Sequence, residues 1–179
     1  IVRPTIDNIY LSGVEIKAQL DFEIDERTKK AISNQAEYLK DISAERIQTE
    51  LTKLLMSDHP EKLITAYELG GTNIILPEFD AMMETPQHNK HHMYNVGEHT
   101  LKVIEEVPAA KNLRLAALLH DIAKPATHTN DGEWDHFYGH NEKGVEIAEE
   151  VLHRLKMDNA TIDRVKRLVY WHDYGMGEL

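Results

Sequence analysis

The stretch LRLAALLHDIA, residues 113 to 123, decides the fold of this chain. Residues 115 to 119 are apolar without a break, so the helix that carries them is expected to be buried on all sides. His120 and Asp121 nevertheless stand at its end. An unpaired carboxylate there would cost on the order of several kcal/mol or take up a proton. A divalent cation bonded to both side chains removes this cost, and the alternative is a hydrogen-bonded His–Asp pair with a structural role alone.

Histidine is unusually abundant from position 88 onward, where ten of the 11 residues of this type fall. His99 lies on the helix before the HD pair, and a second pair, His172 and Asp173, closes the last helix. His136 and His140 are four residues apart, so both rings can face one point if they share a helical turn. The spacing therefore favours a site to which several helices contribute.

These side chains predict a metal centre without thiolate ligands, able to bind one or two divalent ions. Imidazole and carboxylate ligands suit Mn, Fe, Co, Ni, Mg or Zn. The first ion is assigned to a set drawn from separate helices: His99, His120, Asp121 and Asp173. Candidates for a second ion about 4 Å away are His140 and His172, with His136 as the weaker one. Such ions activate water and neutralise phosphate oxygens, so the predicted reaction is phosphoester hydrolysis.

Lys124 directly follows the HDIA run, and we predict that it acts with Asp121 as a catalytic residue. Its ammonium would hold a non-bridging phosphate oxygen. The alternative is a cation at a helix end that opposes the macrodipole. Three further residues, His92, Asn95 and His136, are expected to bind substrate at the entrance of the site, and for the first two the alternative is a solvated helix start.

The fold class is expected to be all-α. Apolar residues recur at helical spacing along nearly the whole chain after residue 20, and no alternating strand pattern appears. Asp25 is a candidate N-cap for a segment in which Ile32, Ala36 and Leu39 share helical spacing, and Ser43 is a candidate for the next. A polar stretch, residues 84–90, predicts a linker between two helical regions. In the second region a loop over 126–139 separates two pairs of helices.

Composition excludes several classes of protein. The chain has 179 residues, 41% hydrophobic and 28% charged, which is near the globular average. It contains no cysteine, so disulfide scaffolds, thiolate zinc sites and cysteine nucleophiles are excluded. The net charge of -11 argues against strong nucleic-acid binding through bulk charge. Without a secretion signal or an apolar run long enough to span a bilayer, the expected location is the cytoplasm.

The order of His99, His120–Asp121 and Asp173 resembles the metal-binding pattern of the HD-domain phosphohydrolase superfamily. Longer strings look like the HD domain of bacterial tRNA nucleotidyltransferases and poly(A) polymerases: YNVGEHT at 94–100, LLHDIAKP at 118–125, HFYGHNEKG at 136–144 and LVYWHD at 168–173. Others look like the neck and body of these enzymes: AQLDFEID at 18–25, ISAERIQTELTKLL at 42–55 and NIILPEFDAM at 73–82. The resemblance implies an RNA-binding-like helical neck/body over 18–86 and an HD domain over 87–179, with 1–17 unassigned.

The resemblance does not extend to the nucleotidyltransferase head. That head carries a Gly-Gly turn and paired aspartates, whereas Gly70-Gly71 here follows a helix and no Asp-x-Asp comes after it. The chain therefore looks like a carboxy-terminal fragment of such a protein. By resemblance, the parent would add CCA to tRNA or polyadenylate RNA. The HD domain would act as a 2',3'-cyclic phosphodiesterase, a 2'-nucleotidase or a phosphatase.

Two other functions stay open at this level. One is a non-catalytic RNA-binding helical module with a vestigial metal site, and the other is a stand-alone nucleotide phosphohydrolase. The expected partners are a small phosphoester or nucleotide substrate and, through the parent protein, tRNA. No membrane partner is expected, and a homo-oligomer is compatible with the sequence.

Overall fold

The computed structural model describes residues 25–87 and 94–174, and this part is helical with one short hairpin. The first range holds α2 (Glu26–Ser33), η1 (Ala36–Asp41), α3 (Ala44–Met56), η2 (Pro60–Lys62), α4 (Leu63–Glu68), α5 (Thr72–Ile75) and α6 (Pro77–Glu84). The second holds α7 (Val96–Glu106), α8 (Lys111–Leu119), α9 (Lys124–Thr127), β1 (Thr129–Asn130), β2 (Asp135–His136), α10 (His140–Arg154) and α11 (Asn159–Trp171). The predicted all-α class is confirmed. None of the helices in these ranges is long and apolar enough to cross a membrane.

Two predicted helix starts are capped as expected. The Asp25 side chain accepts hydrogen bonds from the backbone N–H groups of Arg27 and Thr28, and the Ser43 hydroxyl accepts one from Arg46. The segment that begins at Asp25 is not one α-helix, however. α2 stops after eight residues, and hydrogen bonds to the third preceding residue build the 3-10 helix η1 in its place.

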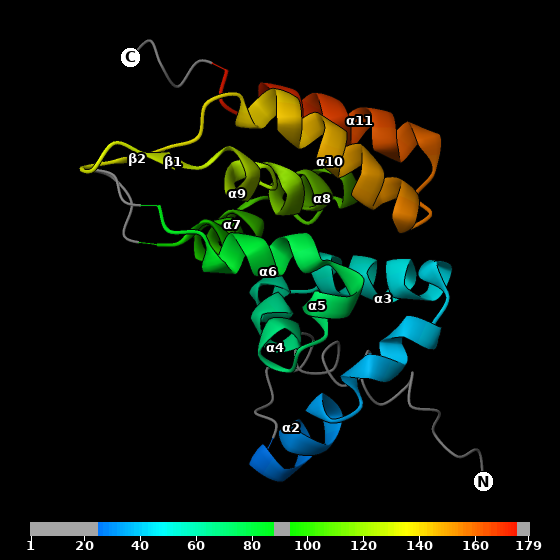
Figure 1. Cartoon of the computed structure of the whole chain (residues 1–179). Helices are drawn as coiled ribbons and strands as arrows, with labels where there is room; N and C mark the ends of the chain where they lie inside the picture. The colour runs from blue at the N-terminus through cyan, green and yellow to red at the C-terminus, as the bar shows by residue number, and fades with distance from the viewer. Residues whose placement is uncertain (1–24, 88–93, 175–179) are drawn as a thin grey trace, which may run out of the picture.

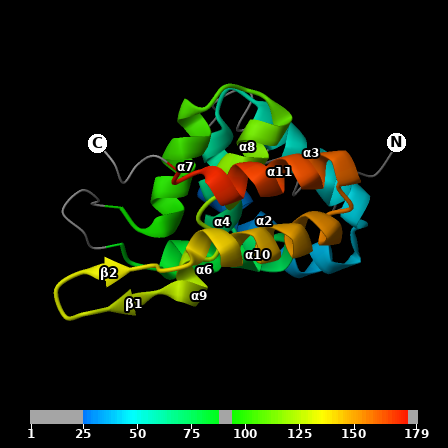
Figure 2. The ribbon, with the colours of Figure 1, turned by 90° about the horizontal axis from the view of Figure 1, so that it is seen from above.

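The helices pack in layers around α8 (Figure 1). α10 packs against α11, α11 packs against α8, and α7 contacts both α8 and α6. α3 reaches α8 as well. From above, α11 lies between α8 and α10 (Figure 2). The apolar stretch of α8 is therefore covered by α3, α7 and α11, which explains why residues 115–119 are all buried.

One buried core runs from α2 to α11, across both described ranges. Polar contacts join the same two parts. Arg154 in α10 donates two hydrogen bonds, of 2.8 and 2.7 Å, to Glu78 in α6. Gln48 in α3 donates one of 2.8 Å to a backbone carbonyl in the turn between α10 and α11. The helices before and after residues 84–90 are therefore packed together.

The loop predicted over 126–139 contains a small antiparallel hairpin, in which Thr129 lies opposite His136. His136 is in β2, whereas His140 begins α10 after Gly139, whose φ is 74°. His136 and His140 therefore do not share the helical turn that would let both rings face one point. His136 ends a strand and a left-handed glycine stands between it and His140, so the two rings do not follow helical spacing.

Candidate metal centre

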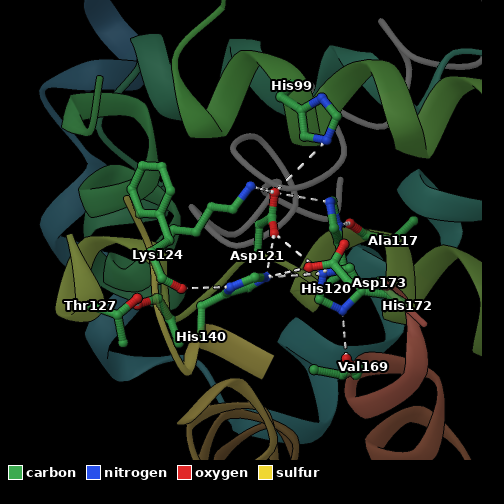
Figure 3. Close-up of polar contacts among 12 residues, drawn as sticks. His99, Ala117, His120, Asp121, Lys124, Thr127, His140, Val169, His172 and Asp173 are labelled. Atoms are coloured by element: carbon green, nitrogen blue, oxygen red, sulfur yellow. Dashed lines mark hydrogen bonds and ion pairs between the residues drawn. The ribbon is translucent and has the colours of Figure 1, made fainter. Parts of the chain in front are cut away.

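Asp121 lies at the centre of the candidate site. α8 ends at Leu119, and His120 and Asp121 follow in the turn that leads to α9. The Asp121 residue is only 1% exposed. Side chains from α7, α9, α10 and the end of α11 converge on its carboxylate (Figure 3). The buried carboxylate predicted from the sequence therefore has several potential partners.

Three histidine rings have their orientation fixed by the backbone. The Nδ1 atoms of His120, His140 and His172 lie 2.7, 2.8 and 2.6 Å from the carbonyl oxygen three residues earlier. A carbonyl oxygen can only accept, so each Nδ1 carries a proton. The Nε2 atom of each ring then offers a lone pair unless it is also protonated. All three Nε2 atoms face Asp121, in the arrangement by which proteins orient metal-binding histidines.

The two carboxylate oxygens of Asp121 face different histidines (Figure 3). Oδ2 lies 3.8 Å from His99 Nε2 and 3.1 Å from His120 Nε2. Oδ1 lies 3.6 Å from His140 Nε2 and 3.5 Å from His172 Nε2. Within each of these groups the potential ligand atoms lie within 4.8 Å of one another. Asp121 thus joins two groups of three residues, and each group could hold a metal ion.

One unsatisfied buried oxygen marks the second group, formed by Asp121, His140 and His172. The two Nε2 atoms are 3.3 Å apart, and Asp121 Oδ1 is buried without a hydrogen-bond partner in the described part of the chain. Lone pairs of two neutral rings and a carboxylate repel one another at such distances, so a proton or a cation has to lie between them. Nitrogen and oxygen donors of this kind fit a divalent metal ion.

Asp173 lies beside the second group. Its Oδ2 is 3.0 Å from His140 Nε2, and its Oδ1 is 3.4 Å from His172 Nε2. The sequence pattern predicts that it binds the same ion as His99, His120 and Asp121. In the structure, its carboxylate instead approaches the two histidines on the other side of Asp121.

Lys124 faces the cluster from the start of α9. Its ammonium is 2.7 Å from Asp121 Oδ2 and 5.2 Å from the centre of the Phe137 ring. The residue is only 9% exposed. The ammonium therefore neutralises a buried carboxylate and is not a solvated charge at a helix end.

Neighbouring charges keep the carboxylates ionised. Burial alone would raise the pKa of Asp121, but the charges of His120 and Lys124 hold that pKa well below its usual range. A hydrogen bond from a histidine lowers the pKa of Asp173. Burial opposes the protonation of His172, yet contacts with Asp121 and Asp173 raise its pKa above the ordinary value. Near neutral pH, both acids are therefore available as ligands.

Two of the remaining predicted residues, Asn95 and His136, lie outside the two groups. The Asn95 side chain accepts a 2.7 Å hydrogen bond from the Glu98 backbone and so caps α7. His136 bonds to Asp131 at 2.8 Å, within the hairpin. His92 falls outside the described residues.

One residue that the sequence analysis missed is Gln87. A cavity of about 420 Å³ opens on the cluster, and Gln87 lines it together with His99, His120 and Asp121. Gln87 is 5% exposed, and its Oε1 has no hydrogen-bond partner among the described residues. It lies in the stretch interpreted as a linker, where a single amide after a proline carries no distinctive signal.

Two family models match successive parts of the chain. Residues 21–83 match the family described as "Probable RNA and SrmB- binding site of polymerase A". Residues 90–178 match the HD domain. The second range contains every residue of both ligand groups.

Several curated bacterial proteins are similar over most of the chain. A CC-adding tRNA nucleotidyltransferase from Thermus thermophilus is 33% identical over 175 residues, which cover 90% of this chain and 40% of the relative. A multifunctional CCA protein from Pseudomonas fluorescens is 30% identical over 165 residues, 88% of this chain and 40% of the relative. Another from Neisseria gonorrhoeae is 32% identical over 169 residues, 90% of this chain and 41% of the relative. The chain thus spans about two fifths of the length of these relatives.

Proposed function

Because this chain belongs to the bacterial tRNA nucleotidyltransferase and poly(A) polymerase family, of which it matches the RNA-binding body and the HD domain, we propose that its histidine–aspartate cluster is a metal-dependent phosphohydrolase site. The metal would be divalent, with His99, His120 and Asp121 holding one ion and Asp121, His140 and His172 a second. Asp173 would complete the second ligand set.

One observation carries this proposal: the buried Asp121 carboxylate lies between two pairs of histidine Nε2 atoms. A structural His–Asp pair needs one ring, whereas four rings converge here. Three of those rings direct Nε2 at the carboxylate because their Nδ1 protons are held by carbonyls. Divalent ions bound there would activate water and neutralise the charge of a phosphate group.

Lys124 supplies a second source of positive charge. Its ammonium touches Asp121 Oδ2 and lines the cavity, so it can also reach a phosphate oxygen of a substrate in that cavity. Phosphoryl transfer depends on such positioning and charge stabilisation. In this proposal, the Lys124 ammonium binds the non-bridging phosphate oxygens. The Asp121 carboxylate, which both ions would share, orients the attacking water.

The proposed substrates are small phosphoesters, of the 2',3'-cyclic phosphodiester, 2'-nucleotide or phosphomonoester type. The test is to remove metal from the purified chain, restore Mn, Ni or Mg, count the ions bound per chain and follow hydrolysis of 2',3'-cyclic AMP, of a 2'-nucleotide and of a simple phosphomonoester. We expect His99→Ala and His172→Ala, one from each group, each to lower metal content and to reduce turnover by about 100-fold or more.

His153→Ala is the matched control, because this histidine lies on the surface of α10 with a side chain 57% exposed. It should retain both metal content and turnover. A chain that binds metal but hydrolyses none of the three substrate types would refute the hydrolase proposal. A chain that binds no divalent ion would refute the metal centre itself.

A second function concerns α2 to α6, which the range that matches the RNA-binding family covers except for the last residue of α6. We propose that this body docks tRNA for the whole protein. A gel shift with tRNA over a salt series tests this, and the affinity should fall as the salt concentration rises. A chain that does not retard tRNA even at low salt would refute a contribution from the body.

A further inference from the structure

The hairpin between α9 and α10 is joined at its base by a buried acid. Its strands have two residues each, and a hairpin of two strands is at best marginally stable alone. His128 precedes β1, and its Nε2 lies 2.6 Å from Asp135 Oδ1 in β2. Because a carboxylate only accepts, Nε2 is the donor. Asn130 Nδ2 donates to the same oxygen at 2.8 Å, and the Asp135 side chain is 2% exposed. The place of the His128 ring is therefore fixed.

Stacked rings connect this base to the candidate metal centre. The His128 and Phe137 rings are stacked, with centroids 5.3 Å apart and planes inclined by 23°. The Lys124 ammonium lies over the Phe137 ring, 5.2 Å from its centre. The face of an aromatic ring is negative and attracts a cation placed over it. Phe137 thus contacts both the hairpin histidine and the ammonium that faces Asp121.

The Phe137 ring matters because the other partner of the ammonium is shared. Lys124 Nζ lies 2.7 Å from Asp121 Oδ2, and the same carboxylate belongs to both candidate ligand groups. An ion bound there would repel the ammonium and compete with it for the carboxylate. The ring is not a metal ligand, so it stays available to the ammonium. Without it, the flexible four-carbon stem of the lysine would let the charge turn away from the cavity.

We propose that Phe137 and His128 are positioning residues, which hold the Lys124 ammonium at the cavity where the phosphate is to bind. Phe137 acts through the face of its ring, and His128 acts by keeping that ring in place. This inference rests on the proposed hydrolase function, in which Lys124 binds the phosphate oxygens. Neither positioning residue lines the cavity, so both act through the lysine and not through contact with the substrate.

The first test needs neither metal nor substrate. It measures the unfolding equilibrium of the metal-free full chain in urea for the wild type, Phe137→Leu, Lys124→Met and the double variant. Leucine keeps apolar bulk and removes the ring face. The two substitutions should be coupled by about 2- to 30-fold in the unfolding equilibrium constant, the range of a cation–π contact. Tyr138→Leu is the matched control, because this ring stacks on His136 and the residue is 79% exposed. Its effect should add to that of Lys124→Met without coupling.

Turnover is the second measurement, made on chains whose bound metal has been counted. The substrates are those of 2',3'-cyclic AMP, 2'-AMP and p-nitrophenyl phosphate that the wild type hydrolyses. Phe137→Leu should keep the metal content, lower kcat/KM about tenfold for each, and have no further effect in a Lys124→Ala chain. Phe137→Tyr retains the ring face and should restore most of the loss.

His128→Gln tests the hairpin's part in this arrangement. Glutamine can still donate to Asp135, but it has no ring to stack on Phe137, so kcat/KM should fall in the same direction and by less than in Phe137→Leu. His153→Gln is the matched control on α10, with a side chain 57% exposed, and should turn over as the wild type does. A His128→Gln chain with wild-type turnover would remove His128 from the proposal.

A merely structural role for Phe137 gives different results. Its effects would then add to those of the lysine substitutions, both in unfolding and in turnover, and either result would overturn the positioning role. Equal losses of turnover in Phe137→Leu and Phe137→Tyr would also overturn it, even if the lysine variants do not fold. If unfolding shows the coupling while no phosphoester is hydrolysed, the contact between Phe137 and Lys124 stands and the hydrolase function falls. If phosphoesters are hydrolysed while both cycles are additive, the positioning role alone falls.

Discussion

Asp121→Asn tests the central carboxylate, because it keeps the shape of the side chain and removes its charge. The Asp121 and Lys124 side chains are 1% and 11% exposed and form a 2.7 Å ion pair. Removing one partner of such a pair costs roughly 3–5 kcal/mol. For a chain of this size, each kcal/mol corresponds to about 2–4 °C, so the metal-free variant should melt roughly 6–20 °C below the metal-free wild type.

Metal addition supplies the second half of this test. An ion at 100 times its Kd stabilises the folded wild type by about 2.7 kcal/mol, or roughly 5–10 °C in Tm. The Asn variant lacks the carboxylate shared by both ligand groups, so Mn should not raise its Tm. Thermal melts followed by circular dichroism, with and without Mn, measure both effects.

The matched control is Asp163→Asn, an exposed aspartate on α11. Its Tm should match that of the wild type, both without metal and after Mn is added. An Asp121→Asn variant that Mn stabilises as much as it stabilises the wild type would refute the assignment of Asp121 as the shared ligand.

Three further predictions concern the scaffold and are checked by denaturant or thermal unfolding. A Cβ at Gly97 would collide with Met83 Sδ and lie 2.9 Å from the Met83 Cα, so Gly97→Ala should lose about 1–3 kcal/mol. Gly144→Ala has room for its Cβ and should gain up to about 1 kcal/mol. Equal effects would refute the packing argument. Arg114 is buried and donates to backbone carbonyls at the ends of α3 and α7, so Arg114→Met should cost about 1.5–3 kcal/mol; an unchanged Tm would contradict this. The Asp158 carboxylate accepts hydrogen bonds from the Thr161 hydroxyl and backbone N–H in the first turn of α11, and these lower its pKa below 3.8. The stabilising effect of the ionised carboxylate is therefore complete above that pH and is lost as the pH falls through the lower, folded-state pKa. Asp158→Asn retains the cap without titrating and should lose less stability between pH 5 and pH 2 than the wild type does, and parallel pH profiles would contradict the assignment.

Much of the local structure can be predicted from the sequence because it depends on neighbouring residues. Asp25 and Ser43 cap helices as their side-chain chemistry dictates. The apolar run before His120 is buried because residues 115–119 carry no polar side chain on any side of the helix. The same reasoning located Asp121 and its histidines, since a buried acid at the end of such a helix requires a charge partner.

Other features depend on how distant segments pack. The sequence shows that His172 and Asp173 follow directly on the last helix, but only the packing of α11 against α8 and α10 decides that His172 approaches Asp121 Oδ1 and that Asp173 approaches His140. The hairpin that moves His136 away from the cluster has strands of two residues each, too short for a period-two pattern to reveal.

The sequence by itself determined that this protein is helical, that it belongs to its family and that it carries ligands suited to a divalent ion, since residue type and short-range spacing suffice for each. Only the tertiary structure decided that Asp121 is shared by two groups of histidines and that Gln87 lines a cavity beside them. These are contacts between side chains far apart in the chain, and their distances are set by the packing of whole helices, which no local pattern encodes.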